Sequence, residues 1–413
     1  MTYLVTATTI GLIIFMAWRQ WMVVRFFRRA ETNQLPPGTP PELVSILQPI
    51  LSGDPTLPQT LGHNLTARRG YACEFLWLVD EDDTVGQEIC TGLIAAYPGA
   101  TVRLLLQPTP PQGVNPKTFK LVNGLAAARG NVICVLDDDT MLPDDGLEQC
   151  LPYLDLPGAG LAFGLPYQVN FGNAWSSLIA LFVNANSLPT YVPYASLHEP
   201  VTINGMFYAL RRSVLDQLGG FSGLEPILAD DFAVAQRVRS HGLHLVQTPL
   251  RHAISTQVPS LRRYLSLMQR WFIFPRESLL RHLPWREQAL VYTLALAPTL
   301  LPLLLLLGLL IWPSPVPAAL LLLYFGLSYV AFLHIDHAYL GHPTPTAWSF
   351  LVPILQVVFP LQILAALLLP QRITWRGHVM QVERGGTGGL RPGRGVPVQR
   401  QFGAVVRGED MTG

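Results

Sequence analysis

The stretch Val132-Ile133-Cys134-Val135-Leu136-Asp137-Asp138-Asp139 decides the fold class of this chain. Five apolar residues in succession predict a strand that is buried on both faces, as in a parallel sheet. The three aspartates follow at the strand's carboxyl end, where α/β sheets bind their ligands. Carboxylate oxygens are the ligands that Mg²⁺ and Mn²⁺ prefer. The stretch therefore predicts a metal site for a nucleotide diphosphate, against the alternative that the acids only form a turn or a helix cap.

The same rhythm of strands and helices extends over the first half of the chain. The expected strands are Leu43–Leu47, Phe75–Val79, Val102–Leu106 and Val132–Leu136, and the expected helices between them include Pro58–Ala67 and Thr84–Ala96. This alternation predicts a mostly parallel sheet with helices on both faces. A second acidic group begins with Asp80 at the end of its strand, so both groups are expected at the same edge.

Composition indicates a membrane protein. Only 13% of the 413 residues are charged, 50% are hydrophobic, and the net charge is +1. A bulk basic surface for nucleic acid is therefore not expected. The basic residues are nearly all arginine, with lysine only at Lys117 and Lys120. The four cysteines show no spacing typical of zinc ligands or of a disulfide framework.

The first membrane segment is expected at Leu4–Val24. Its basic residues, at Arg19, Arg25, Arg28 and Arg29, follow the apolar core of this stretch, which predicts an uncleaved anchor rather than a signal peptide. The positive-inside rule places the N-terminus outside and the next domain in the cytosol.

Three further apolar stretches near the C-terminus, Ala289–Trp312, Val316–Ile335 and Ala347–Leu369, contain prolines, which predicts broken or tilted helices. Three spans would leave the arginine-rich tail outside, whereas its charge favours the cytosol. Either one stretch is re-entrant or the tail does not govern topology. The apolar stretch Phe171–Ala195, broken by polar residues, is expected to be an interfacial helix rather than a span.

These observations predict four regions. They are an N-terminal anchor (1–30), a cytosolic catalytic domain with interfacial helices (42–285), a C-terminal transmembrane region (286–371) and a disordered tail (385–413).

A transferase that uses a nucleotide sugar has to neutralise the leaving diphosphate and to deprotonate the acceptor hydroxyl. Asp137 and Asp139 form a DxD pattern that suits the metal. Asp231 stands at the start of a helical stretch, Asp231–Ser240, and is the candidate base, while Asp230 is expected to support the helix or the base. The structural alternative for either acid is helix capping.

Four more residues are candidates for binding the nucleotide sugar. Arg270 suits a diphosphate, and Trp271 offers a stacking face to a sugar or acceptor, although both also suit a basic interfacial helix. Lys117 could reach phosphate, although a lone loop lysine is more often solvated. Gly205 is expected where the backbone closely approaches the donor sugar.

From about Leu43 to Arg276 the chain resembles the ceramide glucosyltransferase family (glycosyltransferase family 21, family-2-like), including its bacterial hopanoid-associated relatives. The matching stretches are Asp80-Glu81-Asp82-Asp83, Gly113-Val114-Asn115-Pro116-Lys117, the Asp137 segment, Leu228-Ala229-Asp230-Asp231-Phe232, Ser255-Thr256-Gln257-Val258 and Gln269-Arg270-Trp271.

The resemblance implies a GT-A fold, a UDP-sugar donor, Mg²⁺ or Mn²⁺, and inversion at the anomeric carbon. It implies that Asp80 binds the nucleotide, that Asp137 with Asp139 holds the metal and diphosphate, and that Asp231 is the general base. The closing motif of the family begins with Arg or Gln, but this chain has Leu267 there. That departure puts the usual polar contact to donor or product in doubt.

The expected function is transfer of a hexose from a UDP-sugar to a membrane lipid hydroxyl at the cytosolic face of a bacterial inner membrane. Glucose to ceramide is the leading pair, and N-acetylglucosamine to a hopanoid polyol is the alternative. A polysaccharide synthase would need more spans for its channel. A haloacid-dehalogenase-type phosphatase would have Thr or Val where Met141 stands. A non-catalytic membrane scaffold would leave the acids at the element ends unexplained.

Overall fold

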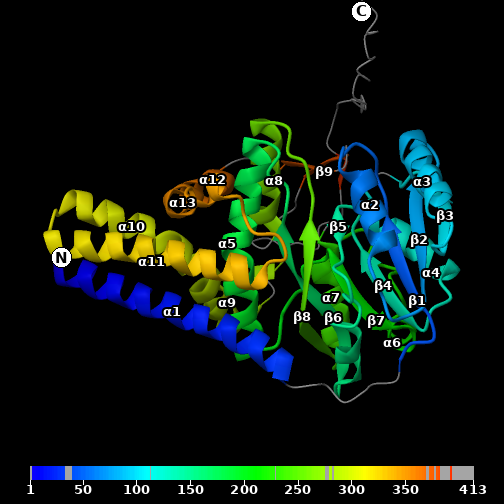
Figure 1. Ribbon diagram of the computed structural model, residues 1–413, viewed down its shortest axis with the longest axis horizontal. Coiled ribbons are helices and arrows are strands. Elements are labelled where there is room, and N and C mark those ends of the chain that lie inside the picture. The colour runs from blue at the N-terminus through cyan, green and yellow to red at the C-terminus, as the bar shows by residue number, and fades with distance from the viewer. Residues whose placement is uncertain are drawn as a thin grey trace, which may run out of the picture.

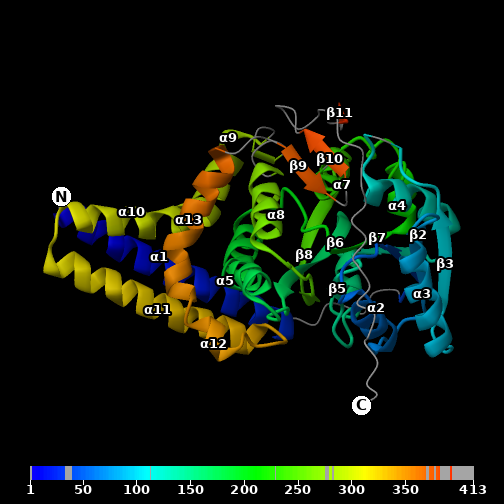
Figure 2. The same cartoon turned by 90° about the horizontal axis from the view of Figure 1, so that it is seen from above.

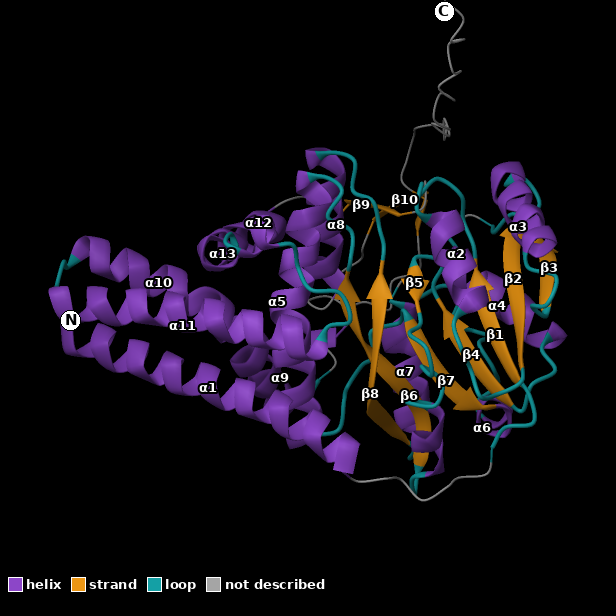
Figure 3. Cartoon of the chain, in the orientation of Figure 1, coloured by secondary structure: helices purple, strands orange, loops and turns teal. Residues whose placement is uncertain are grey.

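The computed structural model describes residues 2–32, 40–111, 113–227, 229–274, 279–280, 283–368, 372–375, 378–381 and 391–392. The chain forms an α/β half, which contains the orange strands in Figure 3, and an all-helical half. The N-terminus lies at the end of the helical half that is far from the sheet (Figure 1). Of the expected disordered tail, only β11 (Arg391–Pro392) is within the described residues.

The main sheet has eight strands among the described residues. They are β1 (Val44–Pro49), β2 (Cys73–Asp80), β3 (Val102–Gln107), β4 (Val132–Leu136), β5 (Thr140–Met141), β6 (Ala159–Gln168), β7 (Phe207–Arg211) and β8 (His244–Ile254). Their order is β3-β2-β1-β4-β7-β6-β8-β5. Strands β1 to β4 are parallel, β7 is antiparallel to β4 and β6, and β8 is parallel to β6. The predicted mostly parallel sheet is confirmed, and β4, β6 and β8 end at the same edge.

Helices cover both faces of this sheet. The helices α2 (Leu57–Thr66) and α3 (Thr84–Ala96) lie on one face, and α4 (Pro116–Ala127), α6 (Arg212–Gln217) and α7 (Asp230–Ser240) lie on the other. Successive strand residues enter opposite cores, so that Ile46 packs toward α2 and Leu47 packs toward α4. All five residues of β4 are buried, as its apolar run predicts.

Three helices have the length and apolarity to cross a membrane among the described residues. They are α1 (Thr2–Thr32), α11 (Pro315–Tyr339), and a continuous helix Trp285–Ile311 made of α9 (Trp285–Val291), a π-helical turn (Tyr292–Leu296) and α10 (Ala297–Ile311). The π turn precedes Pro298, which cannot donate the normal helical hydrogen bond. The predicted interruption by proline is therefore present in this helix.

The helices α5 (Ala174–Leu197), α8 (Leu261–Phe274) and α13 (Val352–Leu368) lie between the bundle and the sheet. In Figure 1, α13 is seen end-on, whereas α1, α10 and α11 lie across the view; Figure 2 shows α13 crossing them. With 17 residues, α13 is roughly 25 Å long, which is short of a bilayer core of about 30 Å. The helix α12 (Thr346–Ser349) is separate from it. The stretch expected as a third C-terminal span is thus a broken, crosswise segment.

After α13, the chain forms a small antiparallel sheet of β9 (Arg372–Trp375), β10 (His378–Gln381) and β11. Figures 1 and 2 place β9 beside the α/β half, and β9 contacts α8. The described end of the chain therefore lies on the same side of the bundle as the main sheet.

Candidate functional site

The aspartates after β4 have three different surroundings. Asp137 faces α4, as described below. Asp138 is buried and accepts a hydrogen bond from the Leu51 amide at 2.8 Å, so it holds the loop after β1. Asp139 accepts a hydrogen bond from the Thr256 hydroxyl at 2.6 Å. Thr256 belongs to the stretch 255–258 quoted above for the family resemblance, and this contact gives that stretch a role beside Asp139.

The N-terminus of α4 brings a lysine into the site. The Asn115 side chain caps the helix by accepting from the amides of Lys117 and Thr118, and Pro116 occupies the first turn. The Asn115 side chain also donates to the Ile227 carbonyl at 3.1 Å. This cap therefore joins the start of α4 to the segment that leads into α7.

Lys117 is buried, and three oxygens surround its ammonium group. Its Nζ lies 2.7 Å from Asp137 Oδ1 and 3.3 Å from Asp230 Oδ2, and it donates to the Gly205 carbonyl at 2.8 Å. Burial alone would lower the pKa of Lys117, but the two carboxylates raise it above the usual value for lysine. Lys117 is therefore a charged centre that joins β4, the loop before β7 and α7, rather than a solvated loop lysine.

Asp231 lies in the first turn of α7, next to this centre. Ala229 is the N-cap residue, so neither Asp230 nor Asp231 occupies the capping position. Burial raises the pKa of Asp231 to about 7, and the negative charge of Asp230 adds to this effect, while the Phe232 amide and Lys117 oppose it. A carboxylate with a pKa near neutrality suits proton transfer at physiological pH.

Gly205 fits tightly against the candidate base. Its φ is +74°, and a Cβ atom at this position would lie 3.0 Å from the Cβ of Asp231. The sequence predicts a close backbone approach at Gly205, and the structure places one there, although against Asp231.

Gly205→Ala should therefore reduce both stability and transfer. The left-handed conformation costs a residue with a Cβ about 1–2 kcal/mol, and the new methyl group would displace Asp231. Gly219→Ala is the matched control, because Gly219 has a φ of +79° and no atom within 4 Å of the added Cβ. Thermal unfolding should shift similarly in both variants, whereas kcat should fall only in Gly205→Ala. Equal activities would contradict the prediction.

Asp80 has a lysine partner of its own, which the sequence reasoning missed. Lys120 Nζ lies 3.1 Å from Asp80 Oδ2 and donates to the Ile50 carbonyl at 2.7 Å. Burial raises the pKa of Asp80, and Lys120 opposes the rise. A usable signal was present, because the only two lysines stand at i and i+3 and therefore on one face of α4. Each lysine pairs with the acid at the end of one strand.

Two tyrosines near the acids were also missed, one fully buried and one partly buried. Tyr208 on β7 is fully buried, and burial raises the pKa of its hydroxyl, with Lys117 opposing the rise. Tyr191 on α5 is close enough to Asp231 for that carboxylate, together with burial as the larger cause, to raise its pKa to about 12. Neither residue belongs to a sequence motif that would have marked it.

Arg270 and Trp271 lie on α8. Trp271 stacks on Phe182 of α5, with ring centroids 6.2 Å apart. Leu267 packs in the same apolar cluster between α5 and α8. The side chain at 267 thus joins two helices by apolar contact, which is why leucine is accommodated there. Arg270 is the neighbouring residue on this helix, partly exposed.

The acids of the site bear on whether a divalent metal can bind here. No group of three or more His, Cys, Asp and Glu side chains that could hold a metal occurs in the described part of the chain. Mg²⁺ is commonly held by one or two carboxylates, with substrate phosphates and water completing its shell. Asp137 and Asp139 fit a metal that arrives with a nucleotide diphosphate, and not one held by protein ligands alone.

A mostly parallel sheet in which β7 runs opposite to its neighbours β4 and β6, with acids at strand ends, is the GT-A architecture of a glycosyltransferase. The profile of glycosyl transferase family 21 matches residues 1–388, so the chain belongs to that family.

Ceramide glucosyltransferase 1 of Caenorhabditis elegans is a curated relative, 23% identical over 249 residues. The alignment covers 60% of this chain and 50% of the relative, so this chain spans about half of that relative's length.

Two solved glycosyltransferases are more distantly similar. A mannosyltransferase from Pyrobaculum calidifontis in complex with GDP-Man and Mn²⁺ has a TM-score of 0.45 and 17% identity, covering 86% of this chain and 99% of its own. GalNAc-T7 with UDP, GalNAc and Mn²⁺ has a TM-score of 0.39 and 12% identity, covering 60% and 54%.

Proposed function

We propose that this family 21 glycosyltransferase moves glucose from UDP-glucose to ceramide or a closely related membrane lipid, with inversion at the anomeric carbon. One observation supports the proposal above all: Lys117 joins the candidate diphosphate residue Asp137 to Asp230, which directly precedes the candidate base Asp231. The family and the Caenorhabditis elegans relative support the choice of sugar and lipid.

In this proposal each charged group has one task. Asp231 accepts the proton of the lipid hydroxyl as that oxygen attacks the sugar. Asp80 helps to bind the nucleotide, and Lys117 holds Asp137 and Asp230 in place. Arg270 meets the departing diphosphate, and Trp271 borders the acceptor side. Mg²⁺ or Mn²⁺ on Asp137 and Asp139 would supply positive charge to the leaving UDP.

The test is UDP release by the detergent-solubilised full chain with Mn²⁺ or Mg²⁺. UDP-glucose, UDP-galactose and UDP-N-acetylglucosamine should be crossed with ceramide, diacylglycerol and bacteriohopanetetrol. We expect release that depends on both UDP-glucose and ceramide. Release only with UDP-N-acetylglucosamine and the hopanoid would replace the proposed pair. No acceptor-dependent release and no UDP binding would favour a scaffold.

The proposed topology places the catalytic half in the cytosol of a bacterial cell, at the inner membrane. Arg25, Arg28 and Arg29 are at the sheet end of α1, and the positive-inside rule assigns that end to the cytosol. Because α13 lies crosswise, only two helices cross the membrane after the catalytic half. The chain leaves the cytosol through α10 and comes back through α11, so the tail arginines lie on the cytosolic side. This arrangement removes the conflict between span count and tail charge.

Reporter fusions test this topology. Alkaline phosphatase fused after Ser314, in the turn between α10 and α11, should be active, whereas the same fusion after Gly341 should be inactive. Green fluorescent protein at the two sites should give the opposite pattern. Phosphatase activity at both sites, or only at Gly341, would refute the orientation.

A further inference from the structure

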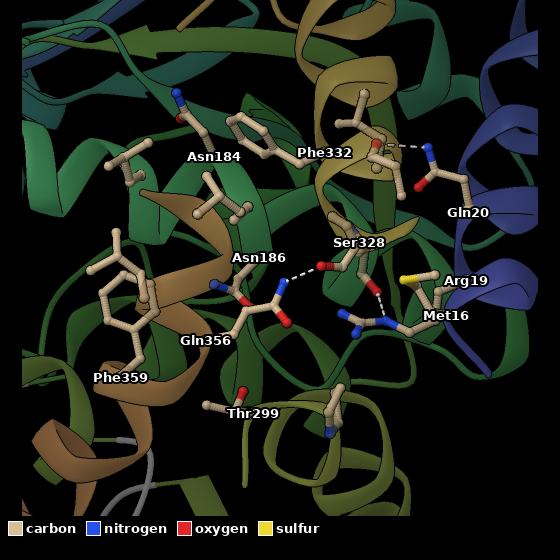
Figure 4. A pocket seen from close by; sticks show the side chains of 18 of the residues that line it. Met16, Arg19, Gln20, Asn184, Asn186, Thr299, Ser328, Phe332, Gln356 and Phe359 are labelled. Atoms are coloured by element: carbon tan, nitrogen blue, oxygen red, sulfur yellow. Dashed lines mark hydrogen bonds between the residues drawn. The ribbon is translucent and has the colours of Figure 1, made fainter. Parts of the chain in front are cut away.

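A cavity with both polar and apolar side chains in its wall lies where the helical bundle meets the α/β half. Its volume is about 90 Å³, enough for several water-sized groups at roughly 10–15 Å³ each. Its walls come from α1, α5, α10, α11 and α13 (Figure 4). It is thus bounded by all three candidate membrane helices and by two helices that cross them. In the proposed topology this is the level of the lipid headgroups on the cytosolic side.

The cation in the wall is already engaged by protein oxygens. Arg19 Nε donates to the Pro189 carbonyl at 2.7 Å, and Nη2 donates to the Thr190 hydroxyl at 3.2 Å. Pro193 has no N–H with which to bond the carbonyl four residues earlier, so Arg19 takes the place of that helical donor. Much of the guanidinium's hydrogen-bonding capacity is therefore used to hold α1 against α5.

The amides in the wall present mainly acceptors. Gln20 donates its amide N–H to the Ala331 carbonyl at 3.0 Å, and Asn186 donates to the Phe182 carbonyl at 2.9 Å. Gln356 donates to the Ser328 hydroxyl at 2.8 Å, as Figure 4 shows. The Gln356 Oε1 atom is buried and has no hydrogen-bond partner among the described residues. A ligand that donates hydrogen bonds would satisfy it, whereas the oxygens would repel an anionic headgroup.

The cavity is coupled to the catalytic half through α5. Asn184, another lining residue, accepts from the Gln168 amide at 2.8 Å and donates to the Gln168 carbonyl at 3.0 Å. Gln168 ends β6, at the same sheet edge as Asp137. Tyr191 stands two positions after the lining residue Pro189 on the same helix. The negative charge of Asp231 raises the pKa of the Tyr191 hydroxyl, with burial as the larger cause. One helix therefore borders both the cavity and the candidate base.

We propose that this cavity binds the polar end of the acceptor lipid, a neutral headgroup with hydroxyl or amide donors, and holds it at the membrane surface beside Asp231. The inference rests on the proposed function for the identity of the lipid. Gln356 Oε1 accepts a hydrogen bond from the headgroup, and the lipid chains remain in the bilayer because the cavity has no room for them.

Photo-crosslinking of the donor-free full chain tests the site without catalysis. The probe is a C6-ceramide with a diazirine next to its amide. We expect labelled peptides from the lining of α11 or α13, and loss of label with excess C6-ceramide but not with phosphatidylglycerol. Label confined to other peptides, or competition by phosphatidylglycerol, would overturn the proposal.

The kinetics of the Gln356→Leu variant provide a second test of the proposed headgroup site. The KM for ceramide should rise about tenfold, as expected for one lost hydrogen bond in a buried site, while the KM for UDP-glucose stays unchanged. Ser349→Ala is the control, since it removes a 3.1 Å contact with Tyr329 between α12 and α11, away from the cavity. Its ceramide KM should not change. An unaltered ceramide KM in Gln356→Leu would show that the headgroup does not bind in this cavity, although the proposed function would still hold. An inactive wild type would contradict the proposed function but not the binding site.

Discussion

Asp231→Asn should abolish transfer and leave UDP binding unchanged. Asparagine has nearly the same shape as aspartate but cannot accept the proton of the lipid hydroxyl. Loss of a general base costs roughly 10²- to 10⁴-fold in rate. The measurements are acceptor-dependent UDP release and, separately, UDP affinity by calorimetry. Retained transfer would remove Asp231 from the mechanism, and lost UDP binding would assign it to the donor site instead.

The same variant should not be less stable than the wild type. The pKa of Asp231 in the folded chain is about 7, above the usual value of 3.8, so the folded state disfavours the ionised carboxylate. At pH 8 ionised Asp231 therefore destabilises the fold, and a neutral asparagine removes that effect. Unchanged or higher thermal stability, together with lost turnover, would separate a catalytic role from a structural one.

The pH profile follows from the same pKa. The base has to be ionised, so kcat/KM should rise with pH through an apparent pKa of about 7. Asp216→Asn is the control, because Asp216 is an exposed carboxylate on α6. It should keep both the rate and the profile. A wild-type profile that is flat between pH 5.5 and 8.5 would contradict the assignment of the base.

The elements that the sequence predicts best are those with strong local signals. Strand β4 begins and ends at the predicted residues, because its apolar run is bounded by Asn131 and Asp137. Helix α3 also has its predicted bounds, since Asp83 caps its first turn by accepting from the Gly86 amide. The acids at strand ends stand directly after apolar runs in the sequence. These features depend on neighbours in sequence, which a single chain displays.

The surroundings of the candidate site depend on distant residues, and the sequence does not display these. Three oxygens surround the buried Lys117, and they come from Asp137, Gly205 and Asp230, which lie 20, 88 and 113 positions further along the chain. The crosswise path of α13 depends on packing against α8 and α10, which composition does not specify. Leu267 likewise makes sense only once α5 is seen beside α8.

Lys117→Met should have the second large effect, on both stability and activity. The side chain is 5% exposed, and its removal leaves the carboxylates of Asp137 and Asp230 close together without their common counter-charge. Breaking a buried ion pair from one side costs about 3–5 kcal/mol. The unfolding free energy should fall by that order, and transfer should fall because Asp137 is no longer held. Chemical denaturation and UDP release are the two measurements.

A comparison of three variants identifies the cause of this loss. The double variant Lys117→Met/Asp230→Asn replaces one of the two unpaired carboxylates by a neutral amide, so part of the lost stability should return. Transfer should not return, because Asp137 still lacks its lysine partner. Arg68→Met breaks an exposed pair with Asp145 at 2.7 Å and should leave stability and transfer nearly unchanged, since solvent screens such pairs. If Lys117→Met behaved like Arg68→Met, the lysine would be a passive filler. If the double variant regained transfer as well, repulsion between the acids, and not the positioning of Asp137, would explain the loss.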